Sequence, residues 1–455
     1  MQISYNWLKD YVPFSLTPEE LSDLLTDCGL EVESLEKYET LPGGLRGVYT
    51  GRVLSCKAHP NADKLKLTVV DAGQHESLPI VCGAPNVEEG QMVLVASVGA
   101  MVNTPKGRFE IKKAKIRGEL SQGMICAEDE LGLGDSHDGI MVLPADTPVG
   151  IPASEYFKLE TDWVYEIGLT PNRIDAASHI GVARDIVAVL NHRYRNNKLS
   201  VKWPEVSGFK PDNTDLAVAV SIEDSSACPR YSSLTIEGVK VGESPDWIKN
   251  RLKAIGLKPI NNIVDITNYV LHETGQPLHA FDLDAVSGRQ VVVKKPPAGT
   301  LFESLDEEKL KLTGDDLMIC NESEPMCLAG ILGGTNSGVT TATKSIFLES
   351  ACFDPVSIRK SARHHGISTD ASFRFERGSD PEITVYVLKR AARLIREIAG
   401  GRISSDISDL YPGKKDGAVI DLSFDRLNML AGKKFERFEV TGILTDLDFE
   451  LLAED

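Results

Sequence analysis

The spacing of apolar residues predicts a helix and then a strand at the start of the chain. Residues 17–20 read Thr-Pro-Glu-Glu, a capping box with proline at the first helical position. Apolar residues follow at helical spacing, namely Leu21, Leu24, Leu25 and Cys28. Gly29 is suited to end this helix, and residues 30–35 then alternate as in a strand.

Between Tyr38 and Ile151 the pattern changes to short β-like runs separated by turn residues. The predicted strands are Val48–Leu54, Lys64–Val70, Met92–Ser97 and Phe109–Ile116. Several short strands in a segment of this length favour a small barrel, and an OB-type barrel fits best.

A helical period returns over Asp175–Asn191, and the Pro- and Gly-containing stretch Lys202–Asp215 is typical of a linker. Residues 216–400 mix strand and helix patterns. They close with a helix that Ser379 or Asp380 caps and that ends at Gly400-Gly401. The last 55 residues predict a new α/β unit that stops just after a strand at Asp448–Leu452, which suggests a truncated chain.

These patterns together predict a multi-domain α+β protein. Residues 1–39 and 152–200 form one discontinuous α/β domain, and an OB-type barrel of residues 40–151 is inserted between its two parts. A mixed α/β domain of residues 206–400 and an incomplete α/β unit of residues 401–455 follow.

Composition narrows the class of protein. The 455 residues are 42% hydrophobic and 25% charged, which is typical of a globular protein with several domains. No apolar stretch reaches the roughly 18 residues of a membrane span, and the start of the chain is unlike a signal peptide, so we expect a cytoplasmic protein without membrane contact. Eight scattered cysteines suit a reducing compartment, and the absence of any C-x-x-C or HExxH motif argues against a metal site.

A basic cluster is the feature of residues 40–151 that points to nucleic acid. The net charge of −18 excludes a protein that coats nucleic acid indiscriminately, but a local field is enough to bind RNA. Alternation with apolar residues predicts a strand with one buried and one charged face, and a solvated edge that blocks aggregation is the alternative. The candidate RNA-binding residues are Lys106, Arg108, Lys112, Lys113, Lys115 and Arg117.

Three long segments carry a family resemblance. They are residues 168–190 (GLTPNRIDAASHIGVARDIVAVL), residues 261–284 (NNIVDITNYVLHETGQPLHAFDLD) and residues 328–381, which include LAGILGGTNSGV, FLESACFDP and STDASFRFERGSDP. Together they resemble the β subunits of bacterial phenylalanyl-tRNA synthetases, and residues 59–65 and 121–133 resemble an EMAP-type tRNA-binding module.

The resemblance implies a ligase subunit that binds phenylalanine tRNA and an α subunit in an α2β2 tetramer. It implies that ATP and Mg²⁺ serve the full enzyme, whose synthetic site lies in the α subunit, and that no cofactor belongs to this segment. It also makes residues 206–400 an editing domain, which hydrolyses tyrosine wrongly attached to phenylalanine tRNA. An apolar synthetic pocket rejects an added hydroxyl only about a hundredfold, so a second site that binds the hydroxyl is needed.

By resemblance, Glu349 accepts the tyrosine hydroxyl and His279 holds or polarises the attacking water. The family's substrate-binding positions fall on Lys258, Asn268, Gly333, Thr369 and Ala371. Lysine at position 258 replaces the family's more usual arginine and loses the bidentate fork. The alternatives are a solvated glutamate at a strand end, a core histidine, and turn or packing roles for the glycine, threonine and alanine.

Two other functions remain open from the sequence. The chain is a tRNA-binding adaptor if the editing pocket is inactive, and it is a stand-alone deacylase if it does not belong to a synthetase.

Overall fold

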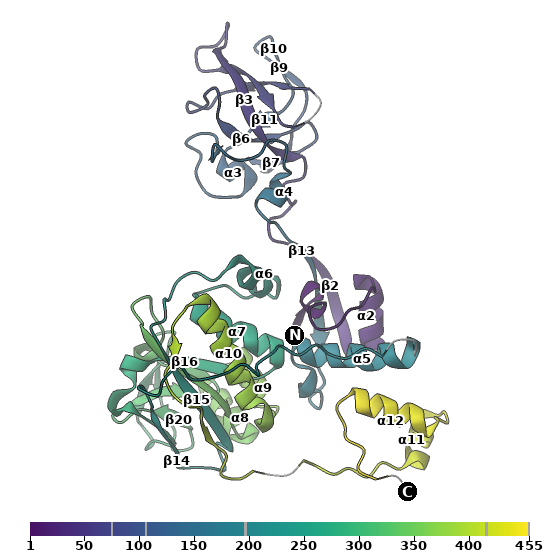
Figure 1. Cartoon of the computed structure of the whole chain (residues 1–455), viewed down its shortest axis with the longest axis vertical. Coiled ribbons are helices and arrows are strands. Elements are labelled where there is room, and N and C mark those ends of the chain that lie inside the picture. The colour runs from purple at the N-terminus through teal and green to yellow at the C-terminus, as the bar shows by residue number, and fades with distance from the viewer. Residues whose placement is uncertain (74–75, 105–106, 195–197, 415–416, 454–455) are drawn as a thin grey trace. The chain divides into compact units, whose positions relative to one another are not determined.

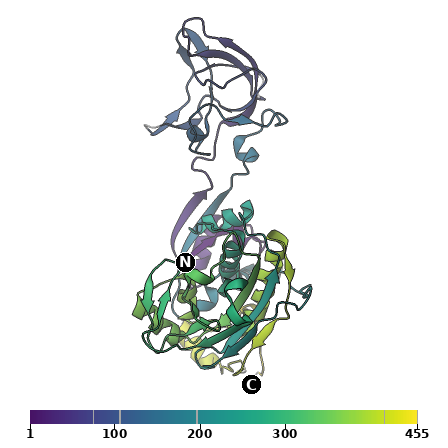
Figure 2. The ribbon, with the colours of Figure 1, turned by 90° about the vertical axis from the view of Figure 1, so that its left-hand side faces the viewer.

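In a computed structural model the chain divides into two compact units, one of residues 1–36 with 163–455 and one of residues 37–162 (Figures 1 and 2). The structure describes all residues except 74–75, 105–106, 195–197, 415–416 and 454–455. No helix in the described ranges is both long and apolar enough to cross a bilayer.

The unit of residues 37–162 is built on a six-stranded, nearly closed barrel-like sheet. Its strands run in the order β11-β6-β3-β4-β5, with β12 also paired to β6. Their bounds are β3 Val48–Ala58, β4 Lys66–Asp71, β5 Leu78–Cys82, β6 Met92–Ala96, β11 Met124–Ile125 and β12 Val142–Leu143. Short helices α3 (Glu128–Leu131) and α4 (Ala153–Tyr156) follow in this unit.

The predicted strand Phe109–Ile116 is wrong. Two separate hairpins occupy this region: β7 (Met101–Thr104) with β8 (Gly107–Glu110), and β9 (Ala114–Ile116) with β10 (Glu119–Ser121). Ile111 lies between them and is buried, whereas Phe109 is 53% exposed. The alternation of apolar and basic residues therefore does not produce one strand with a buried face.

The other unit begins with a three-stranded sheet in the order β1-β13-β2, with strands Gln2–Ser4, Thr161–Gly168 and Glu31–Glu39. Helices α1 (Tyr5–Leu8), α2 (Pro18–Asp27) and α5 (His179–Tyr194) accompany it. Both bonds of the predicted capping box at Thr17 are present. Helix α5 begins four residues later than predicted, after a 3-10 turn at Ile174–Ala176.

Residues 216–410 form two facing sheets. The first runs β14-β17-β20-β21-β22, with strands Ala219–Ile222, Gln290–Lys294, Met318–Cys320, Pro325–Leu328 and Leu332–Gly333. The second runs β16-β23-β15-β24, with β25 also on β15, and its strands are Leu278–Asp282, Ser345–Cys352, Arg230–Glu237, Arg402–Ile403 and Ser408–Leu410. Strands β18 (Leu301–Glu303) and β19 (Lys309–Lys311) form a separate hairpin.

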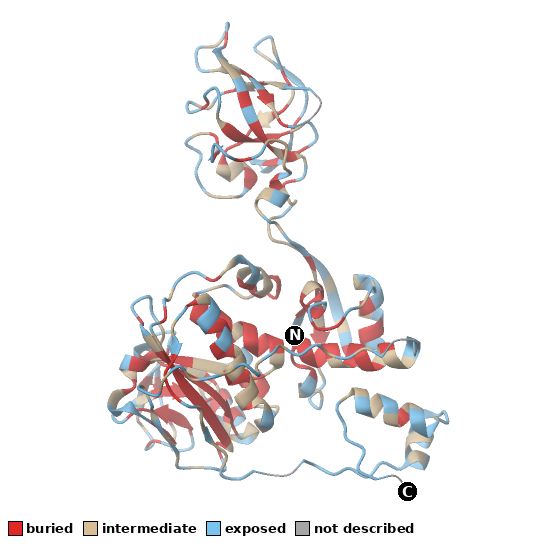
Figure 3. Ribbon diagram, viewed as in Figure 1, coloured by how far each residue is buried: buried red, intermediate tan, exposed pale blue. Residues whose placement is uncertain are grey.

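The second sheet is buried on both faces, as the red strands of Figure 3 show. Tyr231, Phe281 and Phe347 project into an apolar core shared with the first sheet. Leu234 and Leu348 project to the other face, where α7 (Asn262–Thr274) and α10 (Thr384–Ile398) pack (Figure 1). Of the two predicted capping residues, Ser379 and Asp380, it is Asp380 that caps the 3-10 turn Pro381–Ile383, and this turn leads into α10.

The remaining helices of this unit are α6 (Asp246–Ala254), α8 (Pro355–His365), α9 (Asp370–Phe375), α11 (Phe424–Ala431) and α12 (Arg437–Asp446). The predicted strand at Asp448–Leu452 is wrong, because these residues have no regular structure after α12. The mixed α and β class is confirmed, whereas the predicted division into four domains stays a prediction.

A buried polar network joins the first residues of the chain to α7 and α10. Trp7 stacks on His179 and Tyr269 with ring centroids 3.8 and 4.6 Å away, and its Nε1 donates to Tyr11. Tyr11 donates to Oε1 of Glu273 at 2.8 Å, and Arg390 donates to both oxygens of the same carboxylate. Because Glu273 is fully buried, these donors stabilise a charge that water does not reach.

Replacing Arg390 with alanine should destabilise the protein by about 3–5 kcal/mol, because a buried carboxylate loses its cation. Urea unfolding measures this change. The control is Arg393→Ala, which removes an exposed pair with Glu397 and should cost no more than about 1 kcal/mol. Equal losses in the two variants would contradict the assignment of this network as a structural link.

Candidate functional site

The two predicted catalytic residues lie side by side in the second sheet, His279 on the edge strand β16 and Glu349 on the central strand β23. His279 on β16 is directly opposite Glu349 on β23, and Glu349 is directly opposite Ser233 on β15. Ser233 in turn is opposite Ser408 on β25. Residues opposite each other in antiparallel strands share a face, so these four side chains form one polar row in the gap between the two sheets.

Glu349 is a buried carboxyl group with a phenol as its partner. It is 5% exposed, and its Oε2 accepts a hydrogen bond from the Tyr231 hydroxyl at 2.9 Å. Burial disfavours the charged form and raises the pKa of Glu349 to about 8, although the bond from Tyr231 opposes this rise. The solvated-glutamate alternative is therefore excluded, and the group is largely protonated near neutral pH.

His279 carries an unsatisfied nitrogen. The residue is partly exposed, but its Nε2 is buried and has no hydrogen-bond partner within the protein. Burial lowers the pKa of His279 to about 4, so the imidazole is neutral near pH 7. Its ring packs edge-on against Phe281, with centroids 4.4 Å apart. A buried nitrogen without a partner marks a place where water or a ligand is required.

Gly333 lies against the ring of His279. A Cβ atom at this position would be 2.8 Å from Cε1 of His279 and 3.2 Å from its Nε2. Any other residue would therefore displace the imidazole. Gly333 pairs with Cys327 on β21, so this close approach joins the edge of the first sheet to the edge of the second.

Thr369 has a structural role in addition to its predicted one. Its hydroxyl caps α9 by accepting from the backbone of Ser372, and it donates to the carbonyl of Ile331 at 3.0 Å. This bond anchors α9, which carries Ala371 in its first turn, to Ile331. Ile331 lies two residues before Gly333 in the sequence. Lys258 is exposed between α6 and α7, and Asn268 is half-buried on α7. No contact is shown between either of them and His279 or Glu349.

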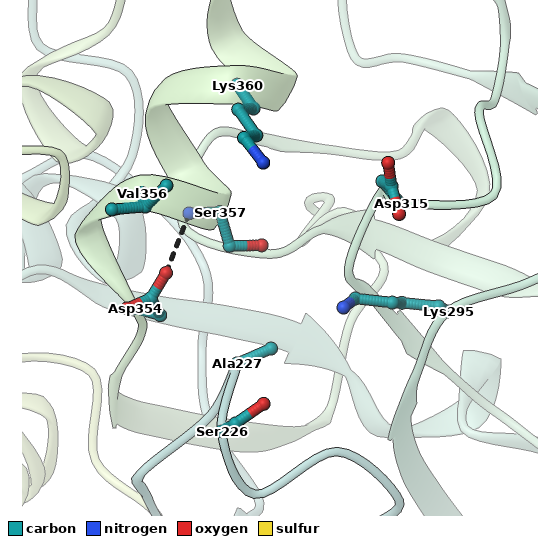
Figure 4. Close-up of a pocket in the computed structure, with 8 residues that line it drawn as sticks. All are labelled: Ser226, Ala227, Lys295, Asp315, Asp354, Val356, Ser357 and Lys360. Carbon is teal, nitrogen blue, oxygen red and sulfur yellow. Dashed lines mark hydrogen bonds between the residues drawn. The ribbon is translucent and has the colours of Figure 1, made fainter.

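Two cavities were located near these sheets. The larger, of about 260 Å³, lies between Lys295, Lys360, Ser226, Asp315 and Asp354 (Figure 4). The smaller, of about 200 Å³, is lined by Ser233, Thr235, Phe347 and Ser408 among others, so it adjoins the polar row. His279 and Glu349 line neither cavity.

Sequence reasoning missed Tyr231 and Ser233. Both lie in β15 (Arg230–Glu237), where an alternation of apolar and polar residues indicates a strand but does not indicate a functional site. The register with β23 places both next to Glu349, more than a hundred residues away in the sequence.

The candidate RNA-binding residues Arg108, Lys112, Lys113, Lys115 and Arg117 are all exposed, and Lys106 lies outside the described residues. Arg108 donates to the Pro42 carbonyl, and Lys112 is 3.7 Å from Glu110. Arg374 on α9 is basic but does not belong to an exposed surface, because it is 1% exposed and donates hydrogen bonds to Asp370 and to the Ala177 carbonyl. No three His, Cys, Asp or Glu side chains in the described parts of the chain come close enough to hold a metal ion.

The pKa of Glu349 generates a prediction about stability. The carboxyl group has an ordinary pKa of 4.5 and about 8 in the folded protein, so between these values the unfolded chain releases a proton that the folded protein keeps. Stability from this group is therefore complete below pH 4.5 and is lost as pH rises toward 8, by about 1.4 kcal/mol per pH unit. The variant Glu349→Gln has no ionisable group at this position, so its stability should not decrease with pH for this reason.

Urea unfolding of wild type and Glu349→Gln at pH 5 and pH 8 measures the difference. Relative to wild type, the variant should gain on the order of 4 kcal/mol between the two values. Exposed Glu397, changed to glutamine, is the control and should show no such gain. A pH-independent difference between Glu349→Gln and wild type would show that the carboxylate is not buried as described.

Comparison with known proteins places the chain in a family. A model described as "B3/4 domain" matches residues 227–400, and a model described as "Putative tRNA binding domain" matches residues 48–152. An N-terminal fragment of the phenylalanyl-tRNA synthetase β subunit from Pyrococcus horikoshii aligns with a TM-score of 0.31 at 14% identity, over 63% of this chain and 77% of that chain. That score is too low to establish a shared fold.

Relatives named "Phenylalanine--tRNA ligase beta subunit" match all of this chain and 55% of their own length. The identity is 50% over 454 residues in Bacteroides fragilis, 51% over 457 in Porphyromonas gingivalis and 44% over 464 in Salinibacter ruber. The chain thus spans a little over half the length of these relatives. Since the identity extends along the whole chain, the chain belongs to the family of phenylalanine–tRNA ligase β subunits.

Proposed function

We propose that this chain carries the editing site of a phenylalanine–tRNA ligase and hydrolyses tyrosine wrongly esterified to phenylalanine tRNA. The observation that carries the proposal is the buried carboxyl group of Glu349 directly opposite the unsatisfied imidazole of His279. A buried polar pair of this kind favours a substrate with a hydroxyl group. Phenylalanine would leave the second carboxyl oxygen of Glu349, which Tyr231 does not bind, without a donor, and this costs more than a missing apolar contact.

The two residues act on different ends of the tyrosyl group. Glu349, in its ionised form, accepts the phenol proton in a charge-assisted hydrogen bond. His279 is neutral near pH 7, so one ring nitrogen accepts a proton from water while the other donates. We assign His279 the task of holding the water that attacks the ester carbonyl, with the terminal ribose hydroxyl of the tRNA assisting. No covalent acyl-enzyme is required.

The other partners follow from family membership. We assign phenylalanine tRNA as the nucleic acid and an α subunit as the protein partner, in an α2β2 assembly in the cytoplasm. ATP and Mg²⁺ belong to the ligase reaction of the whole enzyme. The described residues offer no cluster of metal ligands, and the proposed hydrolysis uses neither group.

The exposed basic residues of the two hairpins in residues 101–121 support a secondary contact with the tRNA. Five of them project from the surface in a short stretch, and such a stripe attracts phosphate groups. This observation also favours the second candidate function, a tRNA-binding adaptor with an inactive editing pocket.

Glu349→Ala in the whole ligase should lower kcat/KM for hydrolysis of tyrosyl-tRNA about 10- to 100-fold, because a charge-assisted hydrogen bond worth about 1.5–3 kcal/mol is lost. His279→Ala should lower kcat more than KM changes, since the attacking water loses its anchor. Release of labelled tyrosine from purified tyrosyl-tRNA measures both. Glu397→Ala, at an exposed position of α10, is the control.

The adaptor hypothesis gives a different result. An adaptor binds tRNA but leaves the rate of deacylation at the uncatalysed level in the wild-type enzyme. Hydrolysis that survives unchanged in both Glu349→Ala and His279→Ala would sink the proposed site, even if tRNA binding is intact.

A further inference from the structure

The hydrogen bond between Tyr231 and Glu349 repeats inside the protein the contact that the editing substrate is proposed to make. A tyrosine hydroxyl donates to a carboxylate oxygen in both cases. Tyr231 is fully buried, and its hydroxyl is 2.9 Å from Oε2 of Glu349. One oxygen of Glu349 is therefore already occupied by a phenol before any substrate binds.

We propose that Tyr231 is a positioning residue for substrate recognition: it holds Oε2 of Glu349 and leaves Oε1 to accept the hydroxyl of the tyrosyl group. This inference rests on the proposed editing function and names a further residue of the same site. Tyr231 does not touch the reacting ester. It acts through Glu349.

The strand register explains how Tyr231 reaches the carboxyl group. Tyr231 is opposite Ala351 on β23, and Glu349 is opposite Ser233, so the tyrosine and the glutamate are diagonal neighbours on one face. A long aromatic side chain spans this diagonal separation. Ala351 is small, which leaves room for the ring above it. The pairing of β15 with β23 thus sets the position of the phenol, and the buried ring has no solvent space into which it could turn.

The groups around Glu349 offer no other strong partner for its charge. His279 faces it from β16 and is neutral near pH 7. Burial raises the pKa values of the Cys228 and Cys327 thiols, and the nearby Glu349 carboxylate raises them further. None of these groups supplies a positive charge. Tyr231, whose own pKa is raised by burial and by Glu349, remains a proton donor and favours the ionised carboxylate. Without its hydroxyl, burial alone acts on Glu349 and the pKa rises further.

Two consequences follow for the reaction. The bond fixes the orientation of the carboxyl group, so the substrate hydroxyl meets an oxygen whose position is set in advance. It also increases the fraction of Glu349 that is ionised at neutral pH, and the ionised form is the better acceptor for a phenol. Hydrolysis of tyrosyl-tRNA should therefore rise with pH as Glu349 ionises.

The test is Tyr231→Phe in the whole ligase, which removes the hydroxyl and keeps the ring. The measurement is kcat/KM for tyrosyl-tRNA and phenylalanyl-tRNA from pH 6 to pH 9, with the uncatalysed rate subtracted at each pH. In the wild type the rate for tyrosyl-tRNA should rise through a midpoint near the Glu349 pKa of about 8. In the variant this midpoint should move up by about one pH unit, so that the rate at pH 7 falls about tenfold and recovers toward pH 9.

The matched control is Tyr165→Phe. Tyr165 is also fully buried in this unit, but its hydroxyl donates to the Pro18 carbonyl, far along the chain from Glu349. The Tyr165→Phe substitution should destabilise the protein about as much as Tyr231→Phe does and should leave the midpoint of the pH profile unchanged. Hydrolysis of phenylalanyl-tRNA should stay at its low wild-type level in both variants.

Four results are distinguishable. An unchanged midpoint in Tyr231→Phe, or a loss that is equal at every pH, would show that Tyr231 only packs and would overturn the inference. A shifted midpoint together with loss of tyrosyl selectivity supports it. If Glu349→Ala leaves hydrolysis of tyrosyl-tRNA intact, the assignment of Glu349 to the tyrosyl hydroxyl fails, and the inference fails with it. The proposed editing function itself fails if the wild-type ligase hydrolyses tyrosyl-tRNA only at the uncatalysed rate.

Discussion

Burial of one carboxyl group between two sheets is the constraint on which the site depends. Glu349 lies on the central strand β23, with paired strands on both sides, a second sheet over one face and helices over the other. Water, which normally stabilises a carboxylate, is excluded there, so the group relies on its few neighbours. Burial raises the pKa of Glu349, and the hydrogen bond from the Tyr231 phenol on β15 opposes this rise and holds Oε2 of the carboxyl group.

The same geometry places polar groups on an otherwise apolar face of the second sheet. A pocket lined only by Phe281, Phe347 and aliphatic residues would accept a benzyl ring and a phenol about equally well. The polar row of His279, Glu349, Ser233 and Ser408 adds hydrogen-bonding groups to this apolar surface. The unsatisfied Nε2 of His279 and Oγ of Ser233 show that the protein alone does not complete the row.

Rigidity comes from outside the sheets. The apolar core on the helical face of the second sheet continues into α5 and into the first residues of the chain. The buried carboxylate of Glu273 fixes this junction through Tyr11 and Arg390. Residues 1–30, α5 and the strands that carry the site therefore share one core, which limits how far β16 and β23 can move.

The sequence by itself determined the elements whose signals are local, and the family. The capping box at Thr17 and the Asp380 cap are read from neighbouring residues. The prediction that His279, Glu349 and Gly333 are site positions came from long segments that resemble a family. Where neighbouring residues mislead, as in Phe109–Ile116 and Asp448–Leu452, the expected strands do not form, because a strand needs a partner that the local pattern does not reveal. Only the tertiary structure decided that Arg374 is buried and that Tyr231 bonds to Glu349. These facts depend on strand register and burial, which join residues more than a hundred positions apart and leave no trace in their local spacing.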